Sequence, residues 1–117
     1  LVKVSTNFEI FEEKMSTIKR FEDLEVWKES RLLSQRIGTL IHEKKFKNNF
    51  RLINQIEGSS GSIMDNIAEG FESQSNPSFC RYLFLARGSA AEIRAQLEVG
   101  AVLKGTITSI KDLTGDR

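Results

Sequence analysis

The stretch from Asn49 to Phe71, NFRLINQIEGSSGSIMDNIAEGF, decides the fold of this chain. Apolar or small side chains recur in it at gaps of three and four residues, which places them on one stripe of an α-helix. The stripe consists of Ile53, Ile56, Ser60, Ile63, Ile67 and Phe71. A run of small residues from Gly58 to Ser62 interrupts good helix formers, and each glycine costs about 1 kcal/mol relative to alanine. We therefore predict a central helix that neighbouring helices stabilise by packing closely against it.

The length and composition are those of one ordinary globular domain. The chain has 117 residues, of which 39% are hydrophobic and 28% are charged. No apolar run approaches the ~20 residues that a membrane-spanning helix needs, and no secretory signal is apparent. The single cysteine, Cys80, cannot form an intramolecular disulfide, which suits a reducing compartment. We expect a cytoplasmic protein with no membrane association. Residues 1–14 are expected to be an expression remnant, a mis-assigned start or a disordered arm, and residues 15–117 the helical domain.

A first helix is predicted from Phe21 to Lys45, with acidic residues at its start and lysines at its end, as the helix dipole favours. Gly38 interrupts its apolar face, and we interpret it as the mark of a close helix crossing. Trp27 is expected to anchor the core or an interface rather than to serve as a stacking platform, because its neighbours are apolar.

The central helix is expected to start after Asn48 or Asn49 and to end near Glu69, with Gly70 just beyond its end. Asn66 lies beside its apolar stripe. We leave two interpretations of Asn66 open: a hydrogen bond to another helix, or partial exposure to solvent.

A third long helix is predicted after Asn76, which would cap it, with Pro77 as its first residue. Its apolar seam consists of Phe79, Leu83, Ala86, Ala90, Ile93 and Leu97. The small residues from Gly88 to Ala91 are expected to cross the small-residue run of the central helix. The third helix should end at Gly100 or Gly105. A short fourth helix is expected from Ser109, with Ile107, Ile110 and Leu113 as its apolar face.

Basic residues gather in two places although the net charge is only +1. The first group is Lys44, Lys45, Lys47 and Arg51, and the second is Arg81, Arg87 and Arg94. Acidic residues dominate the stretch between the two groups. Such runs are commonly solvated faces. The alternative is a basic surface that contacts phosphate groups of a nucleic acid.

The sequence contains no recognisable catalytic constellation. The run Gly58–Ser62 resembles a nucleophile elbow, but its last glycine is replaced by serine and no strand precedes it. The lone histidine, His42, cannot support a metal site with one cysteine elsewhere. Glu69, Asn66 and Glu72 are the remaining candidates for acid–base chemistry. We predict a protein that is not an enzyme and has no cofactor, metal or small-molecule substrate.

Several motifs together resemble one protein family. Residues 21–27, FEDLEVW, look like the opening of the 23S rRNA intervening-sequence proteins, also called four-helix-bundle proteins. The central helix matches at Gln55-Ile56, Ser62-Ile63 and Asn66–Gly70. The third helix matches at Phe79, Ala86–Ser89, Glu92 and Gln96-Leu97. The signature positions are Trp27, Asn66, Ile67, Ala68, Glu69, Gly70, Ala86, Gly88 and Ser89.

The resemblance covers about residues 21–107 and implies an all-α fold, an antiparallel up-down helical bundle in a bacterial protein. It also implies assembly into a ring, commonly a pentamer. Some members are encoded within the extra segment of bacterial 23S rRNA genes. Related accessory proteins of diversity-generating retroelements bind a reverse transcriptase and nucleic acid through a basic surface. This chain departs from the pattern at Met64, where proline is common, and at Glu57-Gly58, where a basic pair is usual. Its fourth helix is short, so we expect three long helices and a truncated fourth.

Two functional hypotheses follow. The first is a non-enzymatic homo-oligomer that associates with RNA or the ribosome through a basic surface. That surface would be formed by Lys44, Lys45, Lys47, Arg51, Arg81, Arg87 and Arg94. The second is a protein-interaction scaffold with no nucleic-acid role, which would expose an apolar patch beside the short fourth helix.

Overall fold

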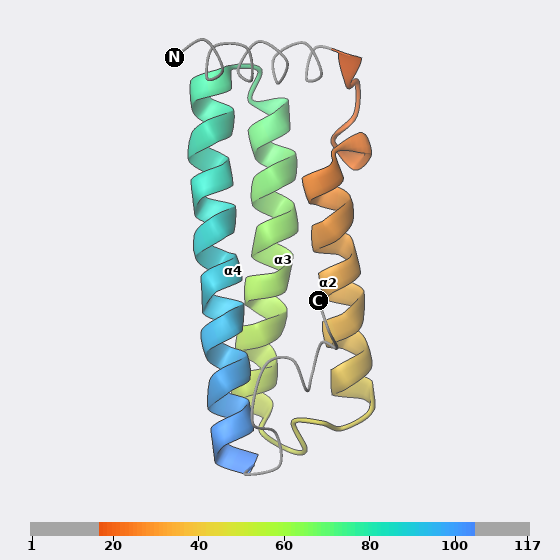
Figure 1. The fold of residues 1–117 in the computed structure, drawn as a ribbon, viewed down its shortest axis with the longest axis vertical. Helices are drawn as coiled ribbons and strands as arrows, with labels where there is room; N and C mark the ends of the chain where they lie inside the picture. Colours follow the sequence, from red (N-terminus) through yellow and green to blue (C-terminus); the bar gives the residue numbers. More distant parts are fainter. Residues whose placement is uncertain (1–16, 105–117) are drawn as a thin grey trace, which may run out of the picture.

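The computed structural model describes residues 17–104, which contain helices and no strand. A 3₁₀ helix, η1 (Phe21–Asp23), precedes three long helices: α2 (Glu25–His42), α3 (Phe50–Glu72) and α4 (Asn76–Lys104). The three helices lie side by side with α3 between the others, and their two connections lie at opposite ends (Figure 1). The all-α prediction is confirmed. Within residues 17–104, no helix combines the length and the apolar character that crossing a bilayer would need.

The core runs along α3, which packs against both α2 and α4. All six predicted stripe residues of α3 are buried or half-buried, and Ile56 and Ile67 are completely enclosed. The predicted seam of α4 is confirmed as well, since each of its six residues is buried or half-buried. Burial of large aliphatic side chains contributes roughly 1.5–3 kcal/mol each. This core offsets the low helix propensity of the small-residue run.

Serine side chains link the three helices at the small-residue run. Ser62 and Ser89 form a hydrogen bond of 3.0 Å between α3 and α4, and Ser34 and Ser60 form another of 3.0 Å between α2 and α3. The two small-residue runs thus meet through Ser62 and Ser89, but the glycines do not mark a close approach, because a Cβ atom at Gly58, Gly61 or Gly88 would meet nothing within 4 Å. Asn66 donates its hydrogen bonds within α3, to the carbonyl and hydroxyl oxygens of Ser62. Of the two interpretations of Asn66, partial exposure fits, since the residue is half-buried and these hydrogen bonds lie within α3.

The first predicted helix was too long at both ends. Residues 21–23 form the 3₁₀ helix, and Leu24 has an extended backbone that separates it from α2. The carboxylate of Glu22 in this segment has a pKa below its ordinary value, because it accepts a hydrogen bond from its own backbone amide and lies 3.1 Å from Arg20. The expected close crossing at Gly38 is wrong: a Cβ atom there would meet nothing within 4 Å.

The turn between α3 and α4 also differs from the prediction. Gly70 does not follow the central helix but lies within it, buried against α4. Gln74, with φ of 64°, takes the left-handed position after the helix that was expected of Gly70. The cap of α4 is Ser75 rather than Asn76, because the Ser75 hydroxyl accepts a hydrogen bond from the backbone amide of Ser78. Of the two predicted ends of this helix, Gly100 is wrong and Gly105 fits, since α4 continues to Lys104.

We expect the substitution Gly70→Ala to destabilise the protein. A Cβ atom at this position would lie 2.7 Å from the Cβ atom of Tyr82 and 2.9 Å from the Phe79 ring. The Tyr82 Cβ atom cannot rotate away, so α3 and α4 must separate, at a cost of about 1–3 kcal/mol. This outweighs the gain in helix propensity, about 1 kcal/mol.

Urea unfolding followed by circular dichroism measures this effect. Gly38→Ala is the matched control, because its Cβ atom meets nothing and should stabilise the protein by up to about 1 kcal/mol. Equal stability of Gly70→Ala and wild type would contradict the close packing at this point.

The remaining predictions on the fold concern segments outside the described residues. These are the N-terminal arm, residues 1–14, and the short helix expected from Ser109 with its apolar face of Ile107, Ile110 and Leu113.

Candidate nucleic-acid interface

The structure divides the seven predicted phosphate-binding residues into two groups. Lys44, Lys45, Lys47 and Arg51 lie within residues 43–51, the connection after α2 together with the first two residues of α3, which we call the basic turn. It joins the end of α2 to the start of α3 at one end of the molecule (Figure 1). All four side chains are exposed to solvent. The other group, Arg81, Arg87 and Arg94, lies along α4.

Backbone hydrogen bonds fix the start of the basic turn. The amide of Lys45 donates to the carbonyl of Leu40, and the amide of Lys44 donates to that of Ile41, both at 3.0 Å. This pair of bonds is a Schellman motif, which ends a helix when the residue after its cap adopts a left-handed conformation. Lys44 occupies that position with φ of 58°. The motif explains why α2 ends at His42, three residues before the predicted end.

A second lysine of the turn is also left-handed. Lys47 has φ of 52°, and its amide donates to the carbonyl of Lys44 at 3.0 Å. Left-handed backbone costs a residue with a side chain roughly 1–2 kcal/mol, whereas glycine adopts it readily. The turn therefore carries lysine at two positions where glycine would be less strained.

We expect Lys44→Gly to stabilise the protein by up to about 1 kcal/mol, because glycine relieves the left-handed strain. Lys45→Gly is the matched control, since Lys45 does not have a positive φ. Glycine at this position relieves no strain and should lower stability, because it adds conformational freedom to the unfolded chain. Urea unfolding of the two variants measures the difference. A loss of stability in Lys44→Gly as large as that in Lys45→Gly would contradict the assigned backbone.

Phe46 attaches the turn to the helices. Its side chain is 2% exposed although both neighbours in the chain are exposed lysines. The ring lies against Gly100 of α4, where a Cβ atom would be 3.5 Å from it. Asn49 then starts α3, because its side-chain oxygen accepts a hydrogen bond of 3.2 Å from the amide of Leu52. The turn is thus held at both ends and in its middle.

The charges of the basic turn are not neutralised by ion pairs with other residues of the described part of the chain. Arg20 forms an ion pair with Glu22 at 3.1 Å, and Lys28 forms one with Glu25 at 3.7 Å. Both lie near the start of α2, at the other end of this helix from the turn. None of the four cations forms an ion pair with a described residue, although Glu43 is adjacent to them in sequence. Their charge is available to an anion in solution.

The three arginines of α4 lie at very different distances from the basic turn. At 1.5 Å per residue, Arg81 lies roughly 28 Å along the helix axis from Gly100, which contacts the turn, and Arg94 lies roughly 9 Å from it. Arg87 borders a shallow hollow of about 280 Å³ with Cys80, Leu83 and Phe84. Arg94 is therefore the arginine of α4 nearest to the basic turn, and Arg81 belongs to the opposite end.

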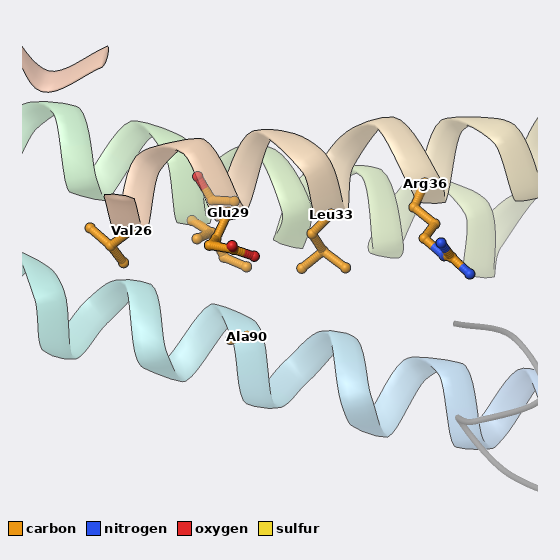
Figure 2. Close-up of a pocket in the computed structure, with 7 residues that line it drawn as sticks. Val26, Glu29, Leu33, Arg36 and Ala90 are labelled. Carbon is orange, nitrogen blue, oxygen red and sulfur yellow. The ribbon is translucent and has the colours of Figure 1, made fainter. Parts of the chain in front are cut away.

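An open groove separates α2 from α4, because both pack on α3 more than on each other. It has a volume of about 410 Å³, with Ile63 of α3 and Ala90 of α4 among its lining residues. Figure 2 shows Val26, Glu29, Leu33 and Arg36 of α2 extending toward α4. The predictions did not include Arg36. Its spacing of three from Leu33 and seven from Glu29 would have placed it on this face.

The signature positions fall into two structural classes. Trp27 is half-buried and packs edge-on against Phe21, with ring centroids 5.4 Å apart. The buried members are Ile67, Gly70, Ala86 and Ser89, the half-buried ones are Asn66 and Ala68, and the exposed ones are Glu69 and Gly88. Most of the signature thus serves helix packing.

The candidates for acid–base chemistry do not gather into a site. Glu69 and Glu72 are exposed, whereas the amide of Asn66 is bonded to Ser62. Across residues 17–104, no three or more His, Cys, Asp and Glu side chains are grouped so as to hold a metal ion.

Phe50 is a surface feature that the sequence analysis missed. It is the first residue of α3 and its side chain is 66% exposed, directly beside Arg51. The sequence did hold a signal for its exposure, because Phe50 lies between Lys47 and Arg51 and outside the apolar stripe of the central helix.

One comparison with known proteins found a match. A family model for the 23S rRNA-intervening sequence protein matches residues 22–110, which is most of the chain. No curated protein and no solved structure is significantly similar to it. The match includes the last two residues of η1, the three long helices and the basic turn. The chain therefore belongs to the family of 23S rRNA-intervening sequence proteins.

Proposed function

We propose that this protein is a non-enzymatic, homo-oligomeric helical-bundle protein that associates with RNA, or with the ribosome, through its basic turn. The observation that carries the proposal is the set of four exposed cations at one end of the molecule, unpaired with any described residue. Lysine and arginine side chains in this state bind phosphate groups by releasing counterions from the nucleic acid. Arg94, and more weakly Arg87, would extend the contact along α4.

Assembly of several copies is the second part of the proposal. The groove between α2 and α4 leaves apolar side chains open along one face, with Val26 46% exposed. Phe84, at 68% exposed, adds apolar surface on α4. A further helix packed on this face would close an antiparallel up-down bundle, and contacts between subunits would build the pentameric ring that the family resemblance implies. The free, exposed thiol of Cys80 suits the cytoplasm as its compartment.

The solution mass of the protein tests both parts. We would measure it by light scattering, with and without a short RNA hairpin, at 50 and 200 mM salt. We expect a stable multimer whose mass rises with RNA at the lower salt and not at the higher, because binding through phosphates weakens steeply with salt. A monomer would contradict the assembly. A multimer that ignores the hairpin at both salts would contradict the RNA association.

A protein-interaction scaffold is the second candidate, and the open groove favours it. Its apolar lining, with Glu29 and Arg36 at separate points along α2, could accept an amphipathic helix of another protein. Pull-downs treated with nuclease separate the two candidates. A protein partner retained after RNA removal, and lost in a Leu33→Asp variant, would favour the scaffold.

A further inference from the structure

The basic turn places one phenylalanine in the core and another in solvent. Phe46 is 2% exposed, whereas Phe50, four residues later, is 66% exposed. Burial of a phenylalanine ring would stabilise the fold by roughly 1.5–3 kcal/mol, and the exposed ring of Phe50 does not contribute this free energy. The Phe50 backbone is fixed in the turn, since its amide donates to the carbonyl of Asn48 at 2.9 Å. The ring is therefore presented at a defined place on the surface.

Two cations lie close to this ring in the sequence. Arg51 follows it directly, and Lys47 precedes it by three residues, which limits the distance between their Cα atoms to about 11 Å. Both side chains are exposed and have no ion pair with a described residue. An exposed aromatic ring with unpaired cations near it in the chain is a combination by which proteins hold single-stranded nucleic acid, with bases stacked on the ring and phosphates on the cations.

We infer that the basic turn binds an unpaired nucleotide of RNA, with its base stacked on Phe50 and the flanking phosphates on Lys47 and Arg51. The inference rests on the proposed RNA association and specifies its target as single-stranded rather than duplex RNA. In a duplex the faces of the bases are covered by their neighbours, and the deep, narrow major groove of the A-form excludes side chains. Phenylalanine has no hydrogen-bonding group, so the contact should accept any of the four bases.

Exposure of a phenylalanine does not by itself indicate a base-stacking site, and Phe84 of α4 is an example. It is 68% exposed, but the hollow beside it is lined by Cys80, Leu83 and a single cation, Arg87. That hollow is mainly apolar, and although the exposed Arg81 and Arg87 lie three residues to either side of Phe84, both belong to α4, away from the lysines of the basic turn. Phe84 is therefore a matched control for Phe50, with the same side chain and nearly the same exposure.

The test is fluorescence anisotropy with labelled oligouridine and with a blunt RNA duplex of the same length, at 50 mM salt. We expect Phe50→Ala to weaken oligouridine binding about 5- to 150-fold, the range found when a stacked base loses its aromatic partner. Phe50→Leu, which keeps apolar bulk but loses the flat face, should weaken it similarly. Phe50→Trp should retain binding, and Phe84→Ala should leave it unchanged. Duplex binding should be weaker than oligouridine binding and insensitive to Phe50.

The inference is overturned if oligouridine binds wild type and Phe50→Leu equally well, or if duplex competes as strongly as single strand. In either case RNA association through the lysines would still stand. If neither RNA binds the wild-type protein, the proposed function fails together with the inference. Circular dichroism of the exposed-site variants should match wild type, since none of them changes the core.

Discussion

Replacement of Phe46 by alanine is expected to lower the free energy of unfolding by about 3–5 kcal/mol, the usual cost of removing a buried phenylalanine. Phe46 is among the largest fully buried side chains of the described residues. Its ring packs against Gly100 of α4. Glycine has no side chain, so it cannot fill the cavity that loss of the ring would leave. Loss of the ring should also release the strained backbone at Lys44 and Lys47.

The comparison with Phe50→Ala makes this prediction specific. Both variants remove a phenylalanine from the same short segment, but Phe50 is exposed and its loss should change stability by less than about 0.5 kcal/mol. Urea unfolding at one fixed protein concentration measures both, because assembly makes stability depend on concentration. Similar effects of the two substitutions would contradict the anchoring role of Phe46.

The triple substitution Lys44→Glu, Lys45→Glu and Lys47→Glu is expected to abolish RNA binding. It removes three phosphate contacts and places three repelling charges at the same end of the molecule. We expect an increase in Kd of roughly 100-fold or more at 50 mM salt. All three side chains are exposed, so the helices should remain folded.

A control must separate the site from the net charge. The control is a second triple variant with the same change in net charge, made at exposed residues before α2 and in its first half: Lys19→Glu, Lys28→Glu and Arg31→Glu. They lie toward the end of α2 opposite to the basic turn (Figure 1). This control should weaken binding by several-fold at most, through its long-range field. Equal losses in both triple variants would mean that RNA responds to net charge and not to the basic turn.

The periodic stripes predicted the core and Asn49 predicted the start of α3, whereas single residues predicted the C-terminal ends of α2 and α3 poorly. The stripes of α3 and α4 follow from spacing, and burial of one face is what stabilises a helix in a protein. Gly70 carried the local signal of a helix end, but tertiary packing against Tyr82 overrides it. The end of α2 carried no such signal, because lysine rather than glycine occupies the left-handed position at residue 44.

The candidate interface was predictable in composition but not in shape. The lysines near residue 45 are adjacent in sequence, so any fold would keep them together. The prediction grouped the arginines of α4 with these lysines by charge alone. This grouping does not hold for Arg81, because the length of α4 separates it from the basic turn. The exposure of Phe50 depends on how the turn sets the first residue of α3, which helical periodicity does not determine.

The central claim is that RNA binds at the basic turn, and hydrogen–deuterium exchange tests it most directly. Exchange would be measured on the intact protein with and without saturating oligouridine at 50 mM salt. The account predicts slower exchange in peptides that cover residues 43–53, with little change in those that cover residues 76–86. Protection confined to α4, or absent while the RNA is bound, would contradict it.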